Sequence, residues 1–108
     1  MAAWQFSYYS AKVQAAIEAW PIGIRASYLR TIETMREHGP DLGMPHTRAM
    51  GGGLFEVRAK GREGIGRAFY CTVTGHRIVI LHAFIKKTQE TPQRELDRAG
   101  ARLKEVKP

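Results

Sequence analysis

Two adjacent lysines, Lys86 and Lys87, stand where an apolar run ends and a helix signal begins. The run from Arg77 to Ile85 is typical of a strand, and Thr91-Pro92 is typical of a helix start. A rigid sheet can aim charge at a ligand from the end of a strand. Ammonium groups in a groove shielded from water suit an anion, and phosphate is the commonest biological anion. The junction therefore makes nucleic acid the first partner to test.

The positive charge of the chain is concentrated around this junction. The net charge is +7, and +6 of it arises between Leu42 and Lys87, where eight basic residues face only two acidic ones. A basic surface can simply keep a protein soluble. Its concentration in a region of strands favours a binding surface instead. The eight basic residues are Arg48, Arg58, Lys60, Arg62, Arg67, Arg77, Lys86 and Lys87.

Other kinds of site find little support in the sequence. The four histidines form no close ligand pairs and Cys71 is the only thiol, so neither a metal nor a cofactor is expected. There is no Gly-x-Ser-x-Gly elbow. Glu56 and Glu63 are isolated among cations, which does not suit the paired carboxylates of glycosidases. The enzyme option that remains is one that works through basic groups.

Three β-like runs must position these cations. They are Leu54 to Lys60, Arg67 to Thr74 and Arg77 to Ile85. Their connections are too short for parallel crossovers, which predicts an antiparallel meander. The first run alternates between apolar and charged residues, so it has one apolar and one charged face. The last run is apolar on both faces, as expected for a strand covered on two sides.

Helical patterns flank the strands. Apolar residues at helical spacing between Val13 and Trp20, and again between Ile24 and Met35, predict a helical hairpin interrupted at Pro21 and stopped at Gly39-Pro40. Trp20 and Tyr28 are expected to pack in the core. The segment from Asp41 to Gly53 is interpreted as a turn, because it is rich in Gly and Pro.

The two ends of the chain complete the expected domain. Ala3 to Tyr8 alternates like a short edge strand, and Thr91 is expected to cap a last helix with Pro92 in its first turn. Residues 1–108 are interpreted as a single domain. With no long apolar segment, no membrane contact and a cytoplasmic location are expected. The apolar stripe of the last helix is Leu96, Ala99, Leu103 and Val106.

Several of these segments together resemble a known family. Leu54-Phe55-Glu56-Val57-Arg58, Arg67-Ala68-Phe69-Tyr70 and the stretch Phe84-Ile85-Lys86-Lys87-Thr88 resemble the RelE/ParE toxin superfamily, and most closely its phage-derived HigB-like branch. The resemblance covers nearly the whole chain. It implies an α+β, RelE-like fold in which a small antiparallel sheet packs against an N-terminal helical hairpin, with a C-terminal helix.

The function implied by the resemblance is that of a type II toxin. RelE-like members are mRNA interferases that cut mRNA in the ribosomal A site, so the implied activity is a metal-independent endoribonuclease that inhibits translation. The implied partners are the ribosome with its mRNA and a cognate helix-turn-helix antitoxin. Operator DNA would be reached only through that antitoxin.

The resemblance also implies roles for individual residues. Arg58 and Arg67 are expected to stabilise phosphate and the transition state, and Lys87 to give a proton or to act as a second charge clamp. Glu56 and His82 are open candidates for the general base. Glu56 could equally be an arginine partner or an antitoxin contact, and His82 lies in an apolar setting. Arg48, Lys60, Arg62 and Lys86 are expected to bind RNA.

Strand geometry adds two conditions. Alternation puts Arg67 on the face of Phe69 and Cys71, but Arg67 is expected to begin its strand, where the pleat need not bury it. Lys86 and Lys87 should point in opposite directions if the strand persists, so at most one of them is aimed at the site. The resemblance favours Lys87.

Two alternatives belong to other functional classes. A ParE-like toxin would inhibit DNA gyrase by binding and would cut no RNA. A non-catalytic RNA-binding module would show salt-sensitive binding and leave RNA intact. The basic set around Arg58, Arg67 and Lys87 favours cleavage, because ParE-like proteins generally lack it.

Overall fold

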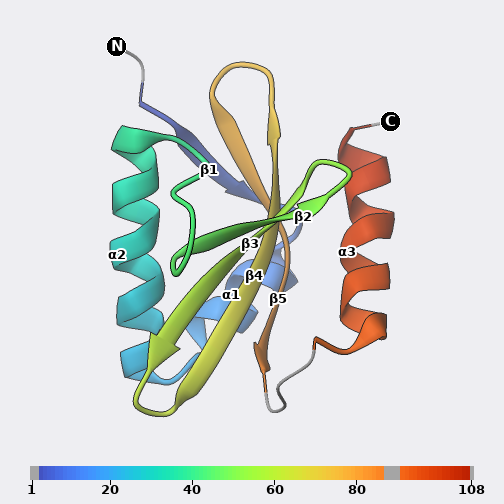
Figure 1. Cartoon of the computed structure of the whole chain (residues 1–108). Helices are drawn as coiled ribbons and strands as arrows, with labels where there is room; N and C mark the ends of the chain where they lie inside the picture. The colour runs from blue at the N-terminus through green and yellow to red at the C-terminus, as the bar shows by residue number, and fades with distance from the viewer. Residues whose placement is uncertain (1–2, 87–90, 108) are drawn as a thin grey trace.

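The computed structural model describes residues 3–86 and 91–107 and has an α+β architecture. A five-stranded sheet separates two helices on one face from one helix on the other (Figure 1). No helix within these residues is long and apolar enough to cross a membrane. The elements are β1 (Gln5–Tyr8), α1 (Ala11–Glu18), α2 (Ile22–His38), β2 (Thr47–Gly51), β3 (Leu54–Gly61), β4 (Gly64–Val73), β5 (Arg77–Lys86) and α3 (Gln93–Val106).

The sheet is mixed rather than wholly antiparallel. Its strand order is β1-β5-β4-β3-β2, and the predicted antiparallel meander of β3, β4 and β5 is confirmed. The expected edge strand at the N-terminus is also confirmed, but β1 runs parallel to β5. The parallel direction of β1 could not be predicted, because two helices and three strands separate β1 from β5 in the sequence. So long a connection permits either orientation.

The segment interpreted as a turn contains a further strand. Thr47–Gly51 forms β2, which pairs antiparallel with β3, and only the glycines from Gly51 to Gly53 make the turn between them. All three glycines have positive φ, which L residues rarely adopt. The buried hydroxyl of Thr47 accepts hydrogen bonds from the amides of Leu42 and Gly43. As an edge strand, β2 lacks the apolar alternation that would have revealed it.

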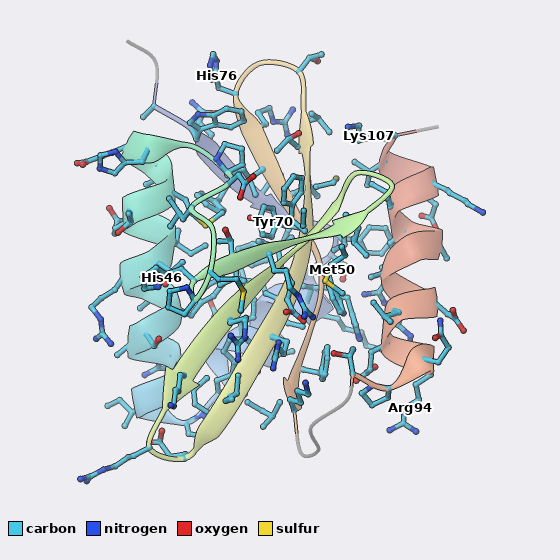
Figure 2. The ribbon with its side chains drawn as sticks, viewed as in Figure 1. His46, Met50, Tyr70, His76, Arg94 and Lys107 are labelled. Carbon is cyan, nitrogen blue, oxygen red and sulfur yellow. The ribbon has the colours of Figure 1, made fainter. Side chains whose placement is uncertain are left out.

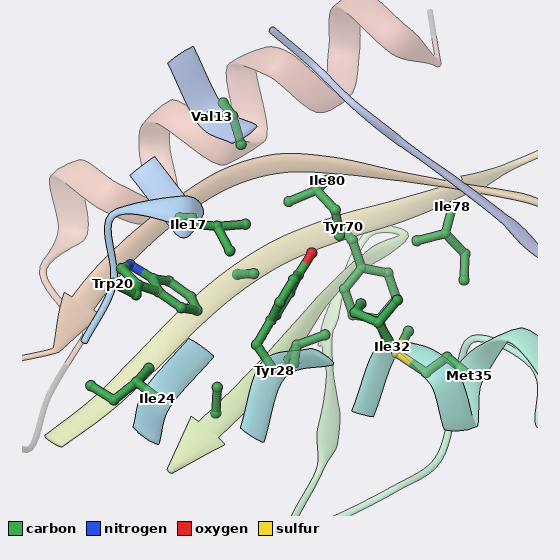
Figure 3. Packing of buried hydrophobic residues seen from close by; sticks show 14 residues of the cluster. Val13, Ile17, Trp20, Ile24, Tyr28, Ile32, Met35, Tyr70, Ile78 and Ile80 are labelled. Atoms are coloured by element: carbon green, nitrogen blue, oxygen red, sulfur yellow. The ribbon is translucent and has the colours of Figure 1, made fainter. Parts of the chain in front are cut away.

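The N-terminal helical hairpin covers one face of the sheet, as predicted. Val13 and Ile17 of α1 and Ile24, Tyr28 and Met35 of α2 pack on the apolar face of the strands (Figure 3). Trp20 and Tyr28 meet edge to face with ring centroids 5.7 Å apart. Their predicted place in the core is confirmed.

The start of α2 lies close against the β3–β4 hairpin. A Cβ at Gly61 would lie 2.5 Å from the backbone nitrogen of Ile24, and one at Gly66 would lie 2.7 Å from the Ile24 side chain. Pro21 occupies the N-cap of α2 and provides no capping side chain. The carboxylate of Glu63 in the hairpin turn replaces that cap by accepting the amide of Gly23 at 3.1 Å.

Helix α3 covers the opposite face of the sheet. Leu96, Ala99, Leu103 and Val106 pack with Phe69, Cys71, Val79 and Leu81, which confirms the predicted stripe. The predicted cap is wrong, because Pro92 and not Thr91 occupies the N-cap and no side chain bonds the first turn. The helix therefore depends on packing and on contacts of its polar residues with the sheet.

Candidate functional site

Cross-strand register gathers the sequence-predicted cations on the α3 face of the sheet. Directly opposed residues of a sheet project to the same side. Arg58 opposes Arg67, which opposes Phe84, and Arg48 opposes Glu56, which opposes Phe69. Lys60 opposes Ile65, which opposes Lys86. The resulting basic cluster is defined by Arg48, Glu56, Arg58, Arg67 and Lys86.

A buried carboxylate lies within this cluster. The Glu56 side chain has no exposed surface, and its Oε1 accepts a hydrogen bond from Nη1 of Arg67 at 2.7 Å. The same oxygen lies 3.4 Å from Nη2 of Arg48. A general base must reach the proton that it removes. Sealed from solvent and shared by two guanidinium groups, Glu56 fits the arginine-partner interpretation and not that of a base.

Arg67 corrects the prediction that its position would leave it open. The strand begins at Gly64, so Arg67 lies inside β4, and only 4% of the residue is exposed. Its predicted face is right, because Arg67 and Phe69 both project toward the α3 side. It can remain charged there because Glu56 lies beside it in the next strand. Arg67 therefore stabilises the site from beneath.

The accessible charge comes from the rest of the basic cluster. The side chain of Arg48 is 44% exposed, and Arg58 and Lys86 are partly exposed. The pKa of Lys86 is lowered from its ordinary 10.5, first by desolvation and then by the positive charge of Arg67, with smaller contributions from Arg48 and Arg58. Glu56 partly opposes this shift. An anion that arrives beside Lys86 would stabilise its charged form, which burial and the neighbouring cations disfavour.

The other predicted cations are placed differently. Lys60 and Arg62 lie exposed at the far end of the β3–β4 hairpin, Lys60 in β3 and Arg62 in the turn. Lys87, the favoured proton donor of the sequence analysis, lies outside the described residues. Of the two adjacent lysines, Lys86 is therefore the one that the structure brings to the basic cluster.

A pocket beside the basic cluster contains a residue that sequence reasoning missed. It has a volume of about 260 Å³ and is lined by Ser27, Pro45, His46, Arg58, Lys60 and Ile65. His46 is exposed in the loop between α2 and β2 (Figure 2), and its carbonyl accepts the amide of Arg58 at 2.9 Å. A neutral imidazole nitrogen can accept a proton, which suits a general base. Its proximity to Arg58 depends on strand pairing, so no local pattern could have indicated it.

His82, the other candidate base, belongs to a separate contact. It is 8% exposed, and its Nε2 lies 2.9 Å from Oε1 of Glu95 in α3. Its Nδ1 lies 3.4 Å from Nη1 of Arg102, which also donates to the carbonyl of Leu81 at 2.8 Å. An arginine can only donate, so Nδ1 is the acceptor and Nε2 carries the proton. His82 therefore joins α3 to the sheet from the apolar setting that the sequence predicts for it.

Metal ligands do not gather anywhere in the described part of the chain. No group of three or more His, Cys, Asp or Glu residues within residues 3–86 and 91–107 could hold a metal ion. Cys71 is buried, and burial raises the pKa of its thiol, which makes it unreactive. The chemistry available at the basic cluster is that of guanidinium, ammonium and imidazole groups.

Comparison with known proteins identifies the family. The family model described as Phage derived protein Gp49-like (DUF891) matches residues 15–104. These residues include the second half of α1, all of α2, the whole basic cluster and most of α3. No curated protein matches the chain. Because the model covers most of the sequence, the chain belongs to the phage-derived Gp49-like family.

Proposed function

We propose that this protein is the toxin of a type II toxin–antitoxin pair and acts as a ribosome-dependent mRNA endoribonuclease. The Gp49-like family is associated with toxin–antitoxin systems. The observation that carries the proposal is the basic cluster, in which a buried carboxylate fixes one arginine beneath three more accessible cations. Such a surface suits a phosphodiester.

The proposed reaction needs no metal. The 2′-hydroxyl of one nucleotide attacks the adjacent phosphorus, and its proton passes to a base. A bond forms between the 2′-oxygen and phosphorus, and the bond from phosphorus to the 5′-oxygen breaks. The leaving 5′-oxygen takes a proton from an acid. Negative charge develops on the non-bridging oxygens between these events, and preorganised cations stabilise it.

The cluster and its pocket offer groups for each step. Arg58 lines the pocket beside His46, so we assign the phosphorane charge to Arg58 and the base to His46. Lys86 has a lowered pKa, which makes it a stronger acid than an ordinary lysine, and we assign it the proton for the leaving oxygen. Lys87 stays a prediction for the same role. Arg48, Lys60 and Arg62 would hold the flanking RNA backbone.

The partners follow from the same proposal. The ribosome would present the mRNA, and a helix-turn-helix antitoxin would neutralise the protein and carry it to operator DNA. The RelE-like character of the fold belongs to this proposal too. A growth arrest that is relieved by a neighbouring helix-turn-helix gene would support the toxin class without reference to the chemistry.

Cleavage of mRNA on programmed ribosomes tests the mechanism. Purified protein should produce discrete cuts that map by primer extension, and Arg58→Ala should lower the single-turnover rate by about 10²- to 10³-fold. His46→Ala and Lys86→Ala should each lower it, and Lys87→Ala tests the residue favoured by the resemblance. Arg77→Ala is the matched control, because exposed Arg77 lies at the opposite end of β5 from Lys86.

Two outcomes would replace the proposal. Salt-sensitive RNA binding by the wild type, with no cleavage, would favour the non-catalytic RNA-binding module. The burial of Arg67 supports this alternative, because it leaves fewer accessible catalytic groups. Inhibition of DNA supercoiling without mRNA cuts would favour the ParE-like alternative. A rate that Arg58→Ala leaves unchanged would remove the basic cluster from the mechanism.

A further inference from the structure

A second basic pocket lies at the opposite edge of the sheet. It has a volume of about 160 Å³ and lies where α1, β5 and α3 meet. It shares no residue with the basic cluster, and no acidic residue is among those that line it. Its lining residues are Lys12, Val13, Ala16, His82, Ala83, Arg98 and Arg102.

The pocket exists because β5 is longer than the strand beside it. β1 pairs with β5 only as far as Ile80, which leaves the rest of that edge of β5 without a neighbouring strand. The first helix packs beside this open stretch with Val13, and α3 passes on the other side of it with Arg98 and Arg102. The floor is therefore apolar and the rim is basic.

One cation of the rim is held in place before any ligand binds. Arg102 donates from Nη1 to the carbonyl of Leu81 at 2.8 Å, and its guanidinium carbon lies 4.7 Å from the centroid of the Tyr9 ring. A guanidinium that is already fixed loses less conformational entropy when a ligand binds to it. Lys12 and Arg98 are exposed and make no ion pair within the described residues.

Two carboxylates of α3 already have partners within the chain. Glu95 faces Nε2 of His82, and Glu105 accepts a 2.6 Å hydrogen bond from the Tyr9 hydroxyl. Neither of them lines the pocket. The positive charge of Lys12, Arg98 and Arg102 is therefore left to solvent or to a ligand from outside the chain.

We propose that this pocket is a binding site for a phosphate group, supplied by a nucleic-acid backbone. Its volume far exceeds the roughly 10–15 Å³ that one water requires, and three cations approach it from two helices. A tetrahedral phosphate accepts hydrogen bonds in several directions, whereas a carboxylate accepts them in one plane. Donors that arrive from α1 and α3 suit the tetrahedral group better than a protein carboxylate.

The proposal does not depend on RNA cleavage. A nucleic-acid strand that binds here would be held both at the basic cluster and at this pocket, whether or not it is cut. Phosphate binding at this pocket and RNA cleavage at the basic cluster can therefore be tested separately.

Inorganic phosphate is the first probe. Amide resonances of residues 12–16, 82–83 and 98–102 should shift on titration in ¹H–¹⁵N spectra, and the double variant Lys12→Ala/Arg98→Ala should weaken that binding by about tenfold or more. The matched control is Arg77→Ala/Arg94→Ala, since it also removes two positive charges, from exposed positions of β5 and α3 that do not line the pocket (Figure 2 labels Arg94). It should leave the affinity within about twofold. Arg102 is left intact because it also holds α3 on the sheet.

The source of the phosphate is tested with a single-stranded oligonucleotide that carries 2′-O-methyl groups, which cannot be cut by 2′-hydroxyl attack. In the wild type, we expect the oligonucleotide to shift resonances at the pocket and at the basic cluster. In the double variant, the shifts at the pocket should disappear and those at the basic cluster should persist. Shifts with free phosphate and none with the oligonucleotide would refute the nucleic-acid source. No phosphate shift at the pocket, or a shift seen only with poly-glutamate, would overturn the proposal and make the pocket unused or a contact for an acidic protein.

Discussion

The α3 face of the sheet is divided into two regions that differ in what covers them. Toward one end, Phe69, Cys71 and Leu81 have no exposed surface and pack under α3. Toward the other, the same strands carry Glu56, Arg67 and the accessible cations of the basic cluster. Both regions belong to one face, and β4 contributes Phe69 to the first and Arg67 to the second, two residues apart.

Element length explains part of this division. The 14 residues of α3 extend about 21 Å at 1.5 Å per residue, whereas the 10 residues of β4 extend about 33 Å at 3.3 Å per residue. Helix α3, which lies beside β5 (Figure 1), is therefore too short to cover the whole length of β4. Where it is absent, a buried ion pair takes over the role of apolar packing. The basic cluster is therefore part of the protein core at Glu56 and Arg67, and only its other residues form an accessible surface.

The largest effect on stability is expected from breaking that ion pair. Glu56→Ala leaves Arg67 buried without a partner, which should lower the free energy of unfolding by about 3–5 kcal/mol. Denaturant unfolding measures it. Glu33→Ala is the control, since Glu33 pairs with Arg36 at the surface and should cost at most about 1 kcal/mol.

A double variant separates charge from packing at the same place. Glu56→Leu/Arg67→Met replaces the buried pair by apolar groups of similar size, and its stability should return close to that of the wild type. RNA binding should still be weakened although the net charge does not change, because the variant removes the fixed guanidinium of Arg67 from beneath the cluster. A double variant as unstable as Glu56→Ala would mean that the region does not behave as a core.

The covered region should respond to truncation in stability alone. Leu81→Ala removes a fully buried side chain under α3 and should cost about 2–5 kcal/mol in unfolding free energy. Leu29→Ala is the control, because Leu29 is 53% exposed on α2 and its loss should change stability by no more than about 0.5 kcal/mol. RNA affinity per folded molecule should stay unchanged for Leu81→Ala. A loss of affinity would show that the two regions are coupled.

Much of this division could be predicted from the sequence, because it depends on local alternation. The pattern from Leu54 to Lys60 gave one apolar and one charged face, and the apolar stripe of α3 was correctly assigned. The face of Arg67 also followed from alternation. Its burial did not, since that depends on an ion pair with Glu56, which lies diagonally across from it in the neighbouring strand. Burial of a charge is decided by its non-local partner.

Two further features were beyond any local pattern. Along β5, Leu81 has no partner in β4 because the register shifts there, so Leu81 and His82 both contact α3. A β-bulge of this kind interrupts the alternation on which face assignments depend. The position of His46 beside Arg58 likewise arises from the pairing of β2 with β3, and β2 itself was interpreted as a turn.

A smaller effect is expected at the exposed rim of the cluster. Arg48→Ala should make the slope of log K against log salt concentration less negative by about 0.7 for single-stranded RNA, if Arg48 contacts one phosphate. Filter binding at several salt concentrations measures it. Exposed Arg94 of α3, which belongs to neither the basic cluster nor the lining of either pocket, supplies the control substitution and should leave the slope unchanged. Equal slopes for wild type and Arg48→Ala would remove Arg48 from the interface.

The smallest effect, and the most specific to the uncovered region, is in the pH dependence of binding. The pKa of Lys86 is lowered from 10.5 by desolvation and by Arg67, so Lys86 loses its charge at a lower pH than an ordinary lysine does. Binding of a base-stable, 2′-O-methyl oligonucleotide should therefore weaken with rising pH at a lower pH than an ordinary lysine would cause. Lys86→Arg keeps its charge throughout this range and should delay the decline. Identical pH profiles for the two proteins would mean that no phosphate contacts Lys86, and the basic cluster would then extend only from Arg48 to Arg58.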